Sequence, residues 1–364
     1  MSAAGWGRAR NILCVRLDAL GDVLMCTPAL RALRQAGEGR RLTLLTSHGG
    51  AAAAPFIDEL DGVIAYPAPW MKSSSPHRPA ADLDCIAALA TQRFDAAVIF
   101  TSYSQSALPA AMLCLLAGIP LRLAHCRENP YQLLTDWVAD PEPGAVLRHE
   151  VRRQLDLVAG IGCDAADGPL SFRVREHDLD GMRRRLADAA IDLQRPWILL
   201  HPGASAPSRR YPADKWIEVI RALDARGAGA LVLSGSTDEL ALVDQIRAGC
   251  AVPVHSFAGK LDLGQLGAAI RLASVMVSSN TGPAHLAAAI GTPLVDLYAL
   301  TNPQHTPWQV EHRVLFHDVA CRFCYKSVCP QGHHDCLGKI DPLEVADAVC
   351  SLLASGTQQP RHVR

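Results

Sequence analysis

Short runs of aliphatic and β-branched residues alternate with stretches of helical periodicity along most of the chain. In the first half, the apolar runs fall at residues 12–15, 42–45, 63–65 and 96–100. Amphipathic stretches separate them, so each run predicts a buried strand followed by a helix. Strands that alternate with helices in this way are typical of a parallel sheet with helices on its faces.

A second series of the same kind begins near residue 197. Its apolar runs lie at residues 197–200, 231–233, 254–257, 275–277 and 293–297. The chain has 364 residues, and one hydrophobic core rarely organises more than about 250–300 residues. We therefore predict an α/β protein with two parallel-sheet domains in tandem.

The segment between the two series, residues 174–195, is rich in charge and predicts a connecting helix. Leu179, Met182 and Leu186 recur there at approximately helical spacing. We interpret the three consecutive arginines at 183–185 as the solvated face of this helix. The predicted division is an N-terminal domain (1–173), the connecting helix (174–195), a C-terminal domain (196–354) and a frayed tail (355–364).

Composition and charge narrow the classes of function. Thirty-five Lys and Arg residues oppose thirty-six Asp and Glu residues, for a formal net charge of −1. No overall field therefore attracts nucleic acid, which we do not expect as a partner. Residues 1–10 lack the apolar stretch of a secretory signal. The longest apolar run, 107–121, is interrupted by Pro and Gly and predicts a core helix followed by a strand, because a membrane span needs about 20 residues. We predict a cytoplasmic protein.

Ligands of open parallel sheets bind beyond the carboxyl ends of the strands, so the residues after each strand are candidates for chemistry. After the first strand comes RLDALGDVL (16–24), where Gly21 allows a tight turn and Asp22 opens a helix. Asp22 could cap this helix by accepting from its free amides. It could also be a general base that takes a proton from an acceptor hydroxyl. Arg16 and Asp18 are the candidate acceptor-binding residues beside it.

The first strand of the second half is followed by HPGASAPSRRY (201–211), in which small and hydroxylic residues precede two arginines. The guanidinium fork of Arg209 matches phosphate oxygens and could neutralise a diphosphate leaving group. The alternative is a pair of solvent-exposed arginines ahead of a helix. Gly203 and Ser205 are candidate donor-binding residues in the same loop.

A third segment, SSNTGPAH (278–285), follows a strand and opens a helix, with Pro283 suited to the first helical position. The amides of Gly282, Ala284 and His285 would then lie at the positive end of the helix dipole, as a phosphate cradle. His285 could equally be a satisfied, partly buried histidine. The sequence has no G-x-G-x-x-G after a strand, no Walker A motif and no G-x-S-x-G elbow, which argues against three common enzyme classes.

Taken together, these segments resemble glycosyltransferase family 9, the lipopolysaccharide heptosyltransferase family. The resemblance extends from residue 12 to about residue 349 and has four marks in the right order. These are VRLDALGD (15–22) with TPAL (27–30), HPGA (201–204) with RRYP (209–212), FAGK (257–260) and NTGPAHLAAA (280–289).

The resemblance implies a GT-B fold, in which two Rossmann-like domains face each other across a cleft. The first domain would hold the acceptor and the second the nucleotide sugar. It also implies an inverting, metal-independent transfer that needs no cofactor, with ADP-heptose as donor and an inner-core lipopolysaccharide sugar as acceptor. Such an enzyme would be cytoplasmic, with peripheral contact to the cytoplasmic face of the inner membrane. The alternatives are a family member with another nucleotide sugar or glycan acceptor, and a nucleotide-sugar-binding protein without catalysis.

The resemblance also implies roles for individual residues. Asp22 becomes the catalytic base, and Arg209 takes the place of the phosphate-binding cation. The family's Asp-Thr-Gly motif falls on Asn280, Thr281 and Gly282, with His285 one helical step further.

A ribose-binding acid is expected in the turn after residue 233, either Asp238 or Glu239. Two residues depart from the family pattern. Arg209 replaces a common lysine and keeps its charge, whereas Asn280 replaces a common aspartate and removes a carboxylate near the donor.

Four of the twelve cysteines form a group near the C-terminus, Cys321-x2-Cys324-x4-Cys329-x6-Cys336, with two histidines inside it. Thiolates and imidazoles at such spacings suit tetrahedral zinc, although the sequence leaves metal, reduced thiols and a disulfide open. We expect no catalytic metal. The other cysteines lie in apolar surroundings and behave as small hydrophobes.

The acceptor is the least defined part of the sequence interpretation. Lipopolysaccharide cores carry carboxylates and phosphates, which Arg148, Arg152 and Arg153 could meet together with Arg16. Each of these could equally be an ordinary surface arginine.

Overall fold

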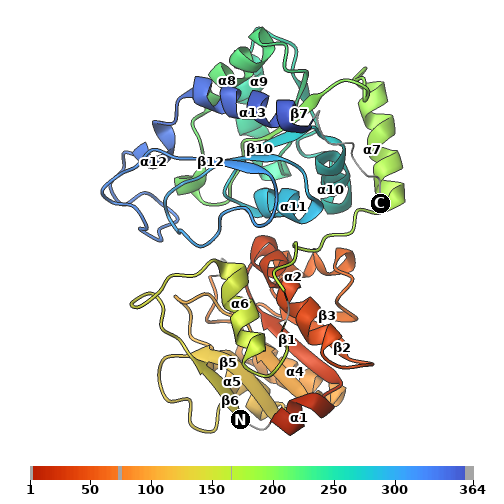
Figure 1. Ribbon diagram of the computed structural model, residues 1–364, viewed down its shortest axis with the longest axis vertical. Coiled ribbons are helices and arrows are strands. Elements are labelled where there is room, and N and C mark those ends of the chain that lie inside the picture. The colour runs from red at the N-terminus through yellow and green to blue at the C-terminus, as the bar shows by residue number, and fades with distance from the viewer. Residues whose placement is uncertain (1–2, 73–75, 165, 357–364) are drawn as a thin grey trace. The chain divides into compact units, whose positions relative to one another are not determined.

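The chain divides into two compact units, Met1–Phe172 and Arg173–Arg364. The computed structural model describes residues 3–72, 76–164 and 166–356. Each unit contains one six-stranded parallel sheet with helices on both faces (Figure 1). The predicted fold class, two parallel-sheet domains in tandem, is therefore confirmed.

The sheet of the first unit has the order β3-β2-β1-β4-β5-β6. Its strands are β1 (Asn11–Arg16), β2 (Arg41–Thr46), β3 (Gly62–Ala65), β4 (Ala96–Ile99), β5 (Leu121–Cys126) and β6 (Asp136–Ala139). Its helices are α1 (Ala3–Arg8), α2 (Leu20–Gln35), α3 (His48–Ala51), α4 (Pro79–Gln92), α5 (Leu108–Leu116) and α6 (Glu150–Ala159), with a short 3₁₀ turn at Ala54–Phe56. The strand order reverses between β1 and β4, and such a switch point is where open α/β sheets bind ligands.

The sheet of the second unit repeats this topology in the order β12-β11-β10-β7-β8-β9. Its strands are β7 (Trp197–His201), β8 (Ala230–Leu233), β9 (His255–Ser256), β10 (Val275–Ser279), β11 (Leu294–Leu297) and β12 (His312–Leu315). Its α-helices are α7 (Glu176–Asp188), α8 (Ala213–Ala225), α9 (Leu240–Gly249), α10 (Leu263–Leu272), α11 (Gly282–Ile290), α12 (Asp335–Gly338) and α13 (Pro342–Gly356). Two 3₁₀ turns lie at Pro207–Arg209 and Thr237–Glu239. Here the strand order reverses between β7 and β10.

Strand β1 is buried on both faces of its sheet. Leu13 and Val15 belong to the hydrophobic cluster that includes residues of α4 and α5. Side chains alternate along a strand, so Cys14 and Arg16 point to the opposite face, where α2 and α6 pack against each other. This alternation places an arginine in the interior of the first unit.

The second unit is built in the same way. Ile198 and Leu200 of β7 pack in the cluster that α8, α9 and α13 share, while Leu199 and His201 alternate to the other face. Figure 1 shows α10 and α11 on that other side of the sheet. The loops after β7 and β10 thus emerge side by side at the switch point of this sheet.

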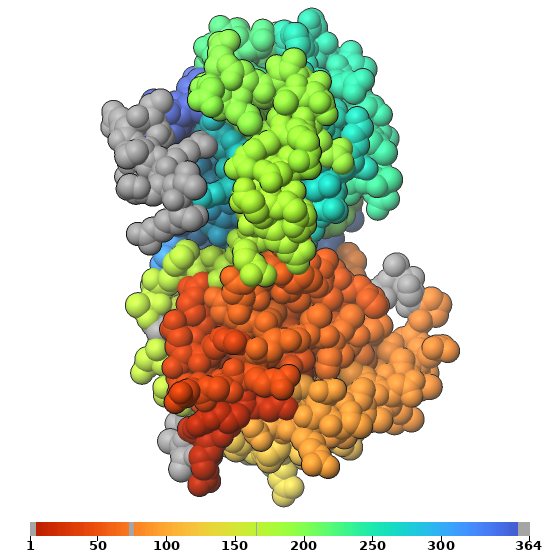
Figure 2. Space-filling model, turned by 90° about the vertical axis from the view of Figure 1, so that its right-hand side faces the viewer, coloured from red at the N-terminus to blue at the C-terminus, as the bar shows by residue number. Residues whose placement is uncertain are grey.

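The predicted connecting helix is confirmed as α7, and it packs on α10 within the second unit. Figure 2 shows this yellow-green segment lying on the blue-green surface of that unit. Two arginines of the run 183–185 are exposed and Arg185 is half-buried, as expected for a solvated helix face. The predicted tail was wrong at its start, because α13 continues through Ser355; residues 357–364 lie outside the described residues.

The apolar run 107–121 forms α5 and leads into β5, as predicted. Two strands were not predicted, β6 and β12. Both are short edge strands, and their sequences DWVA and HRVL include charged residues. None of the described helices is both long and apolar enough to cross a membrane.

Pro28 lies inside α2, where it cannot donate to the carbonyl of Leu24. The hydroxyl of the preceding Thr27 takes over, since Thr27 Oγ1 donates to Leu24 O over 2.6 Å. The same buried oxygen accepts from Ser171 N over 2.9 Å. The Thr27 hydroxyl therefore pairs with two backbone groups, the Leu24 carbonyl and the Ser171 amide.

We expect Thr27→Val to lower the free energy of unfolding by about 1–3 kcal/mol. Valine has a similar shape but no hydroxyl, so Leu24 O and Ser171 N lose their hydrogen-bond partner. Urea denaturation followed by circular dichroism measures this. Thr91→Val is the matched control: Thr91 Oγ1 makes the same kind of bond to Ala88 O, but on an exposed surface. An equal, small loss for both variants would contradict the role of Thr27.

Candidate active site

The helix that carries Asp22 begins at Leu20, with Ala19 as its N-cap. Asp22 is therefore the third residue of the first turn, and its interpretation as the N-cap was wrong. The helix therefore begins three residues earlier than an N-cap at Asp22 implies. Its carboxylate points instead to Arg16, with Asp22 Oδ1 3.0 Å from Arg16 Nη2.

Arg16 lies at the centre of a cluster of three carboxylates. Its Nε is 2.8 Å from Asp18 Oδ2, its Nη2 is 3.0 Å from Asp22 Oδ1, and its Nη1 is 2.6 Å from Glu150 Oε1. The side chains of Arg16 and Glu150 have no exposed surface, whereas Asp18 and Asp22 are 17% and 23% exposed. Asp18 and Asp22 are thus partly exposed at the surface, although the arginine that they contact is buried.

Burial would lower the pKa of Arg16, but the three carboxylates raise it well above its usual value. For Asp18, burial is the cause that raises the pKa. Burial raises the pKa of Asp18 to about 6, and Asp22 adds to the rise, while Arg16 and a hydrogen bond from Gln105 oppose it. Gln105 Nε2 donates to Asp18 Oδ1 over 2.7 Å from the loop after β4. The cluster therefore joins the two loops that flank the switch point of the first sheet.

The other arginines considered for the acceptor are engaged by carboxylates of their own unit. Arg153 is buried and donates to Asp140 and Glu142, and Arg148 donates to Glu142. Arg152 forms an ion pair with Asp167. The interpretation of Arg153 as an ordinary surface arginine was wrong, because its guanidinium is buried against Asp140 and Glu142.

Arg209 links the loop after β7 to the loop after β10 in the second unit. It lies at the end of the 3₁₀ turn after β7, and its Nη1 donates to Asn280 O over 3.2 Å. Arg210 turns away, with its Nε on Ala204 O at 2.8 Å. Arg209 is therefore half-buried beside the start of α11, whereas Arg210 is exposed.

Helix α11 begins at Gly282, with Thr281 as N-cap and Pro283 at the second helical position. The amides of Ala284 and His285 donate to Thr281 O at 3.0 and 3.4 Å. The predicted cradle was wrong for these two amides, because the N-cap carbonyl already accepts their bonds. His285 is 6% exposed, as its alternative interpretation expected, and stands edge-on to His305.

The side chain of Asn280 is locked to one backbone unit. Its Oδ1 accepts from Ala299 N at 3.2 Å and its Nδ2 donates to Ala299 O at 3.3 Å. A carboxylate could accept the first bond but would repel the second oxygen. The amide at this position thus ties the loop after β10 to the end of β11.

A carboxyl that the sequence did not single out lies on the neighbouring strand. Asp296 of β11 is fully buried, and neither of its oxygens has a hydrogen-bond partner among the described residues. Burial raises the pKa of Asp296, and Arg209 opposes the rise. Only the unusual acid within the apolar run 293–297 could have indicated it from sequence.

Glu239, and not Asp238, lies beside the loop after β7. Its Oε2 accepts from Ser236 N at 2.7 Å and lies 3.7 Å from His201 Nε2, whereas Asp238 is exposed. Gly203 leaves room for it, because a Cβ at this position would displace the Glu239 carboxyl. Burial lowers the pKa of His201, and Glu239 opposes this.

Of the remaining donor candidates, Thr281 is buried and Ser205 is exposed on the loop after β7.

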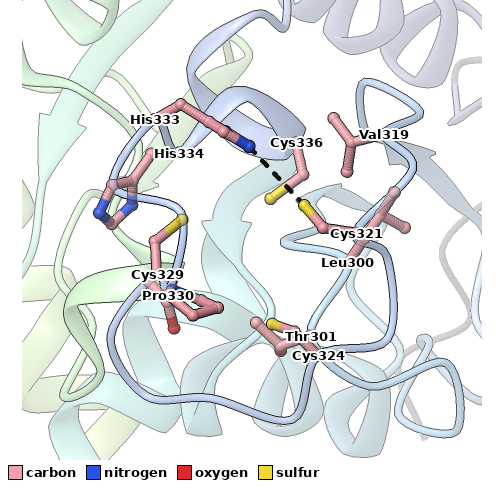
Figure 3. A pocket seen from close by; sticks show the side chains of 11 residues that line it. Leu300, Thr301, Val319, Cys321, Cys324, Cys329, Pro330, His333, His334 and Cys336 are labelled. Atoms are coloured by element: carbon pink, nitrogen blue, oxygen red, sulfur yellow. Dashed lines mark hydrogen bonds between the residues drawn. The ribbon is translucent and has the colours of Figure 1, made fainter.

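The cysteine segment braces the loop of Arg209. Cys321, Cys324, Cys329 and Cys336 are free and line one small pocket (Figure 3), with Cys321 Sγ 3.7 Å from His333 Nε2. Among the described residues, no three His, Cys, Asp or Glu side chains are arranged to hold a metal ion. The backbone of the segment accepts two bonds from Ser208, at Ser327 O and Lys326 O. The cysteine segment therefore packs against the loop after β7.

Residues 84–334, more than half of the chain, match the sequence profile of Glycosyltransferase family 9 (heptosyltransferase). The chain belongs to glycosyltransferase family 9. Lipopolysaccharide heptosyltransferase 3 of Escherichia coli is 26% identical over 292 residues, which cover 79% of this chain and 83% of the relative. As a member of this family the protein is a glycosyltransferase.

Solved structures show the same fold. The family 9 glycosyltransferase of Veillonella parvula superposes with a TM-score of 0.80 at 19% identity, covering 95% of this chain and 98% of the other. The ADP-heptose lipopolysaccharide heptosyltransferase II of E. coli gives 0.73 at 23% identity, covering 95% and 99%. The fold of this family 9 chain is therefore GT-B, as the resemblance implied.

Proposed function

We propose that this family 9 enzyme transfers a heptose from ADP-heptose to a sugar of the lipopolysaccharide inner core, with inversion and without a metal ion. The observation that carries the proposal is the bond from Arg209 to Asn280 O. It joins the loops after β7 and β10 and holds a guanidinium at the start of α11, where an anion is favoured by the helix dipole.

The donor is proposed from the second unit. Arg209 would bind the diphosphate bidentately, and Glu239 would hold the ribose hydroxyls. Thr281, Gly282 and His285 lie at the same edge of the sheet, and Gly203 and Ser205 lie on the loop after β7 that also carries Arg209. The nucleotide is proposed to be ADP because the similar E. coli enzyme is an ADP-heptose transferase.

The acceptor is proposed to bind at the surface of the first unit where Asp18 and Asp22 are exposed. Asp22 takes the proton of the acceptor hydroxyl as its oxygen attacks the anomeric carbon of the donor. The bond between that carbon and the diphosphate breaks on the opposite face, which inverts the anomeric configuration. The negative charge then develops on the diphosphate, where Arg209 and the dipole of α11 stabilise it.

Arg16 was predicted to bind the acceptor directly. We propose instead that it orients Asp18 and Asp22 from the interior of the first unit. Its nitrogens face three carboxylates and none of its side chain is exposed. An acceptor would therefore meet Asp18 and Asp22, with Arg16 orienting both. We propose that the reaction takes place in the cytoplasm, at the face of the inner membrane that carries the acceptor.

A thermal-shift panel of ADP, GDP, UDP and dTDP tests the donor. We expect ADP to raise the melting temperature selectively, because a ligand that binds only the folded state stabilises it by RT ln(1 + [L]/Kd), about 2.7 kcal/mol at 100 Kd. Turnover of ADP-heptose with a lipopolysaccharide-core acceptor then tests the reaction. Selective binding of another nucleotide would replace the donor and keep the mechanism, whereas no binding by any of them would favour a protein without catalysis.

A further inference from the structure

Glu150 is the first residue of α6, 134 positions from Arg16, yet its Oε1 lies 2.6 Å from Arg16 Nη1. Both side chains are fully buried. Removing one partner of such a pair leaves an uncompensated buried charge, which costs several kcal/mol. The fold therefore fixes this pair, and no substrate can touch Glu150.

The geometry of Arg16 transmits this constraint to the surface. A guanidinium is flat and its five N–H groups keep fixed directions, so holding one nitrogen orients the others. With Nη1 held by Glu150, Arg16 presents Nη2 to Asp22 and Nε to Asp18. Removing Glu150 would leave the far side of the guanidinium free to tilt.

Glu150 is itself held in place. Gln154 Nε2 donates to Glu150 Oε1 at 2.8 Å, and the same nitrogen lies 3.1 Å from Thr101 O. These contacts tie α6 to the end of β4. The orientation of Arg16 thus depends on a chain of buried bonds from the far side of the switch point.

We propose that Glu150 is a positioning residue for the transfer reaction, because by holding Arg16 it fixes the direction in which Asp22 presents its carboxylate to the acceptor hydroxyl. This inference rests on the proposed function, since it needs Asp22 to be the base.

The charge of Glu150 gives the role a second signature. The charged and titratable groups that face one another here from β1, α2 and α6 are Arg16, Asp18, Asp22, Cys26 and Glu150. Gln105, from the loop after β4, is neutral. Glu150 contributes to the raised pKa of Asp18 by repulsion. Without that negative charge the pKa of Asp18 falls, so the Asp18 carboxyl loses its proton at lower pH.

The test is Glu150→Gln, which keeps the shape of the side chain and replaces its charge-assisted bond to Arg16 Nη1 with a weaker, neutral one. We expect kcat to fall about 10- to 100-fold, the cost of a misplaced catalytic group, while KM for ADP-heptose stays unchanged. The acidic limb of the pH–rate profile should move to lower pH. Glu150→Asp keeps the charge, so its acidic limb should stay at the wild-type position even if kcat falls.

Glu59→Gln is the matched control. Glu59 is also a buried acid that accepts from an arginine of the first unit, with its Oε1 2.9 Å from Arg31 Nε. This variant can lose stability but should keep the wild-type kcat and pH–rate profile. If Glu59→Gln and Glu150→Gln changed activity alike, the effect would be structural and the proposal would be overturned.

Gln154→Met replaces the test if Glu150→Gln does not fold, because it keeps the charge of Glu150 and removes the amide that donates to Glu150 Oε1 and to Thr101 O. A lower kcat at unchanged donor KM supports the proposal, and a wild-type kcat overturns it. Asp22→Asn is assayed beside these variants. If it keeps full transfer, the proposed function and this inference both fail; if it is inactive while Glu150→Gln matches wild type, only the role of Glu150 fails.

Discussion

Asp22→Asn is expected to fold normally and to lose transfer activity by about 10²–10⁴-fold, the range of a missing general base. The amide oxygen can still accept from Arg16 Nη2, as Asp22 Oδ1 does over 3.0 Å. What the variant lacks is a group that can take the acceptor's proton. The loss should therefore appear in kcat, with KM for ADP-heptose unchanged.

The measurement is the initial rate of heptose transfer to a lipopolysaccharide-core acceptor, with the melting temperature recorded for each variant. Asp82→Asn is a suitable control, because Asp82 is also an acid in the first turn of a helix of the first unit and accepts from Tyr66. Control and wild type should transfer at equal rates. A rate for Asp22→Asn within threefold of wild type would remove Asp22 from the mechanism.

The positions of the candidate loops could be predicted because they follow from short-range patterns. Each apolar run ends at a strand terminus, and parallel topology brings the termini of neighbouring strands to one edge of the sheet. The loops that begin at Arg16, His201 and Asn280 are found at the carboxyl ends of β1, β7 and β10. Fold and loop placement therefore needed only periodicity and Gly or Pro signals.

The contacts inside the site could not be predicted in this way. Arg16 reads as an exposed cation in sequence, and its burial depends on Glu150, which no local pattern links to β1. The amides of α11 were misjudged because one residue decides where a helix begins. Such details depend on tertiary packing and on exact capping, which vary independently of hydrophobic periodicity.

The role of Asn280 shows how the structure changes an interpretation of the sequence. As a departure from the family pattern it suggested a lost contact to the sugar. In the structure it clamps Ala299 through both atoms of its amide, and Arg209 donates to its backbone oxygen. Asparagine at this position therefore has a structural role, because an aspartate could not donate to Ala299 O.

Arg209→Gln is expected to abolish the stabilisation by ADP and to lower kcat about 10²–10³-fold, as loss of one preorganised electrostatic contact does. In the proposed mechanism Arg209, held beside the start of α11 by its bond to Asn280 O, stabilises the leaving diphosphate. Arg209→Lys keeps the charge but loses the fork, and should retain intermediate activity.

The fold should tolerate the loss of Arg209 because of the neighbouring buried acid. Burial already raises the pKa of Asp296 and Arg209 only opposes this, so without Arg209 the Asp296 carboxyl takes up a proton and leaves no unpaired buried charge. Arg210→Gln is the matched control, since Arg210 is exposed and its side chain donates to Ala204 O in the same loop. Thermal shift with ADP and steady-state kinetics should separate the two arginines. If Arg209→Gln binds ADP as wild type does while Arg210→Gln does not, the diphosphate lies on the outer side of the loop and the donor site must be redrawn around Arg210.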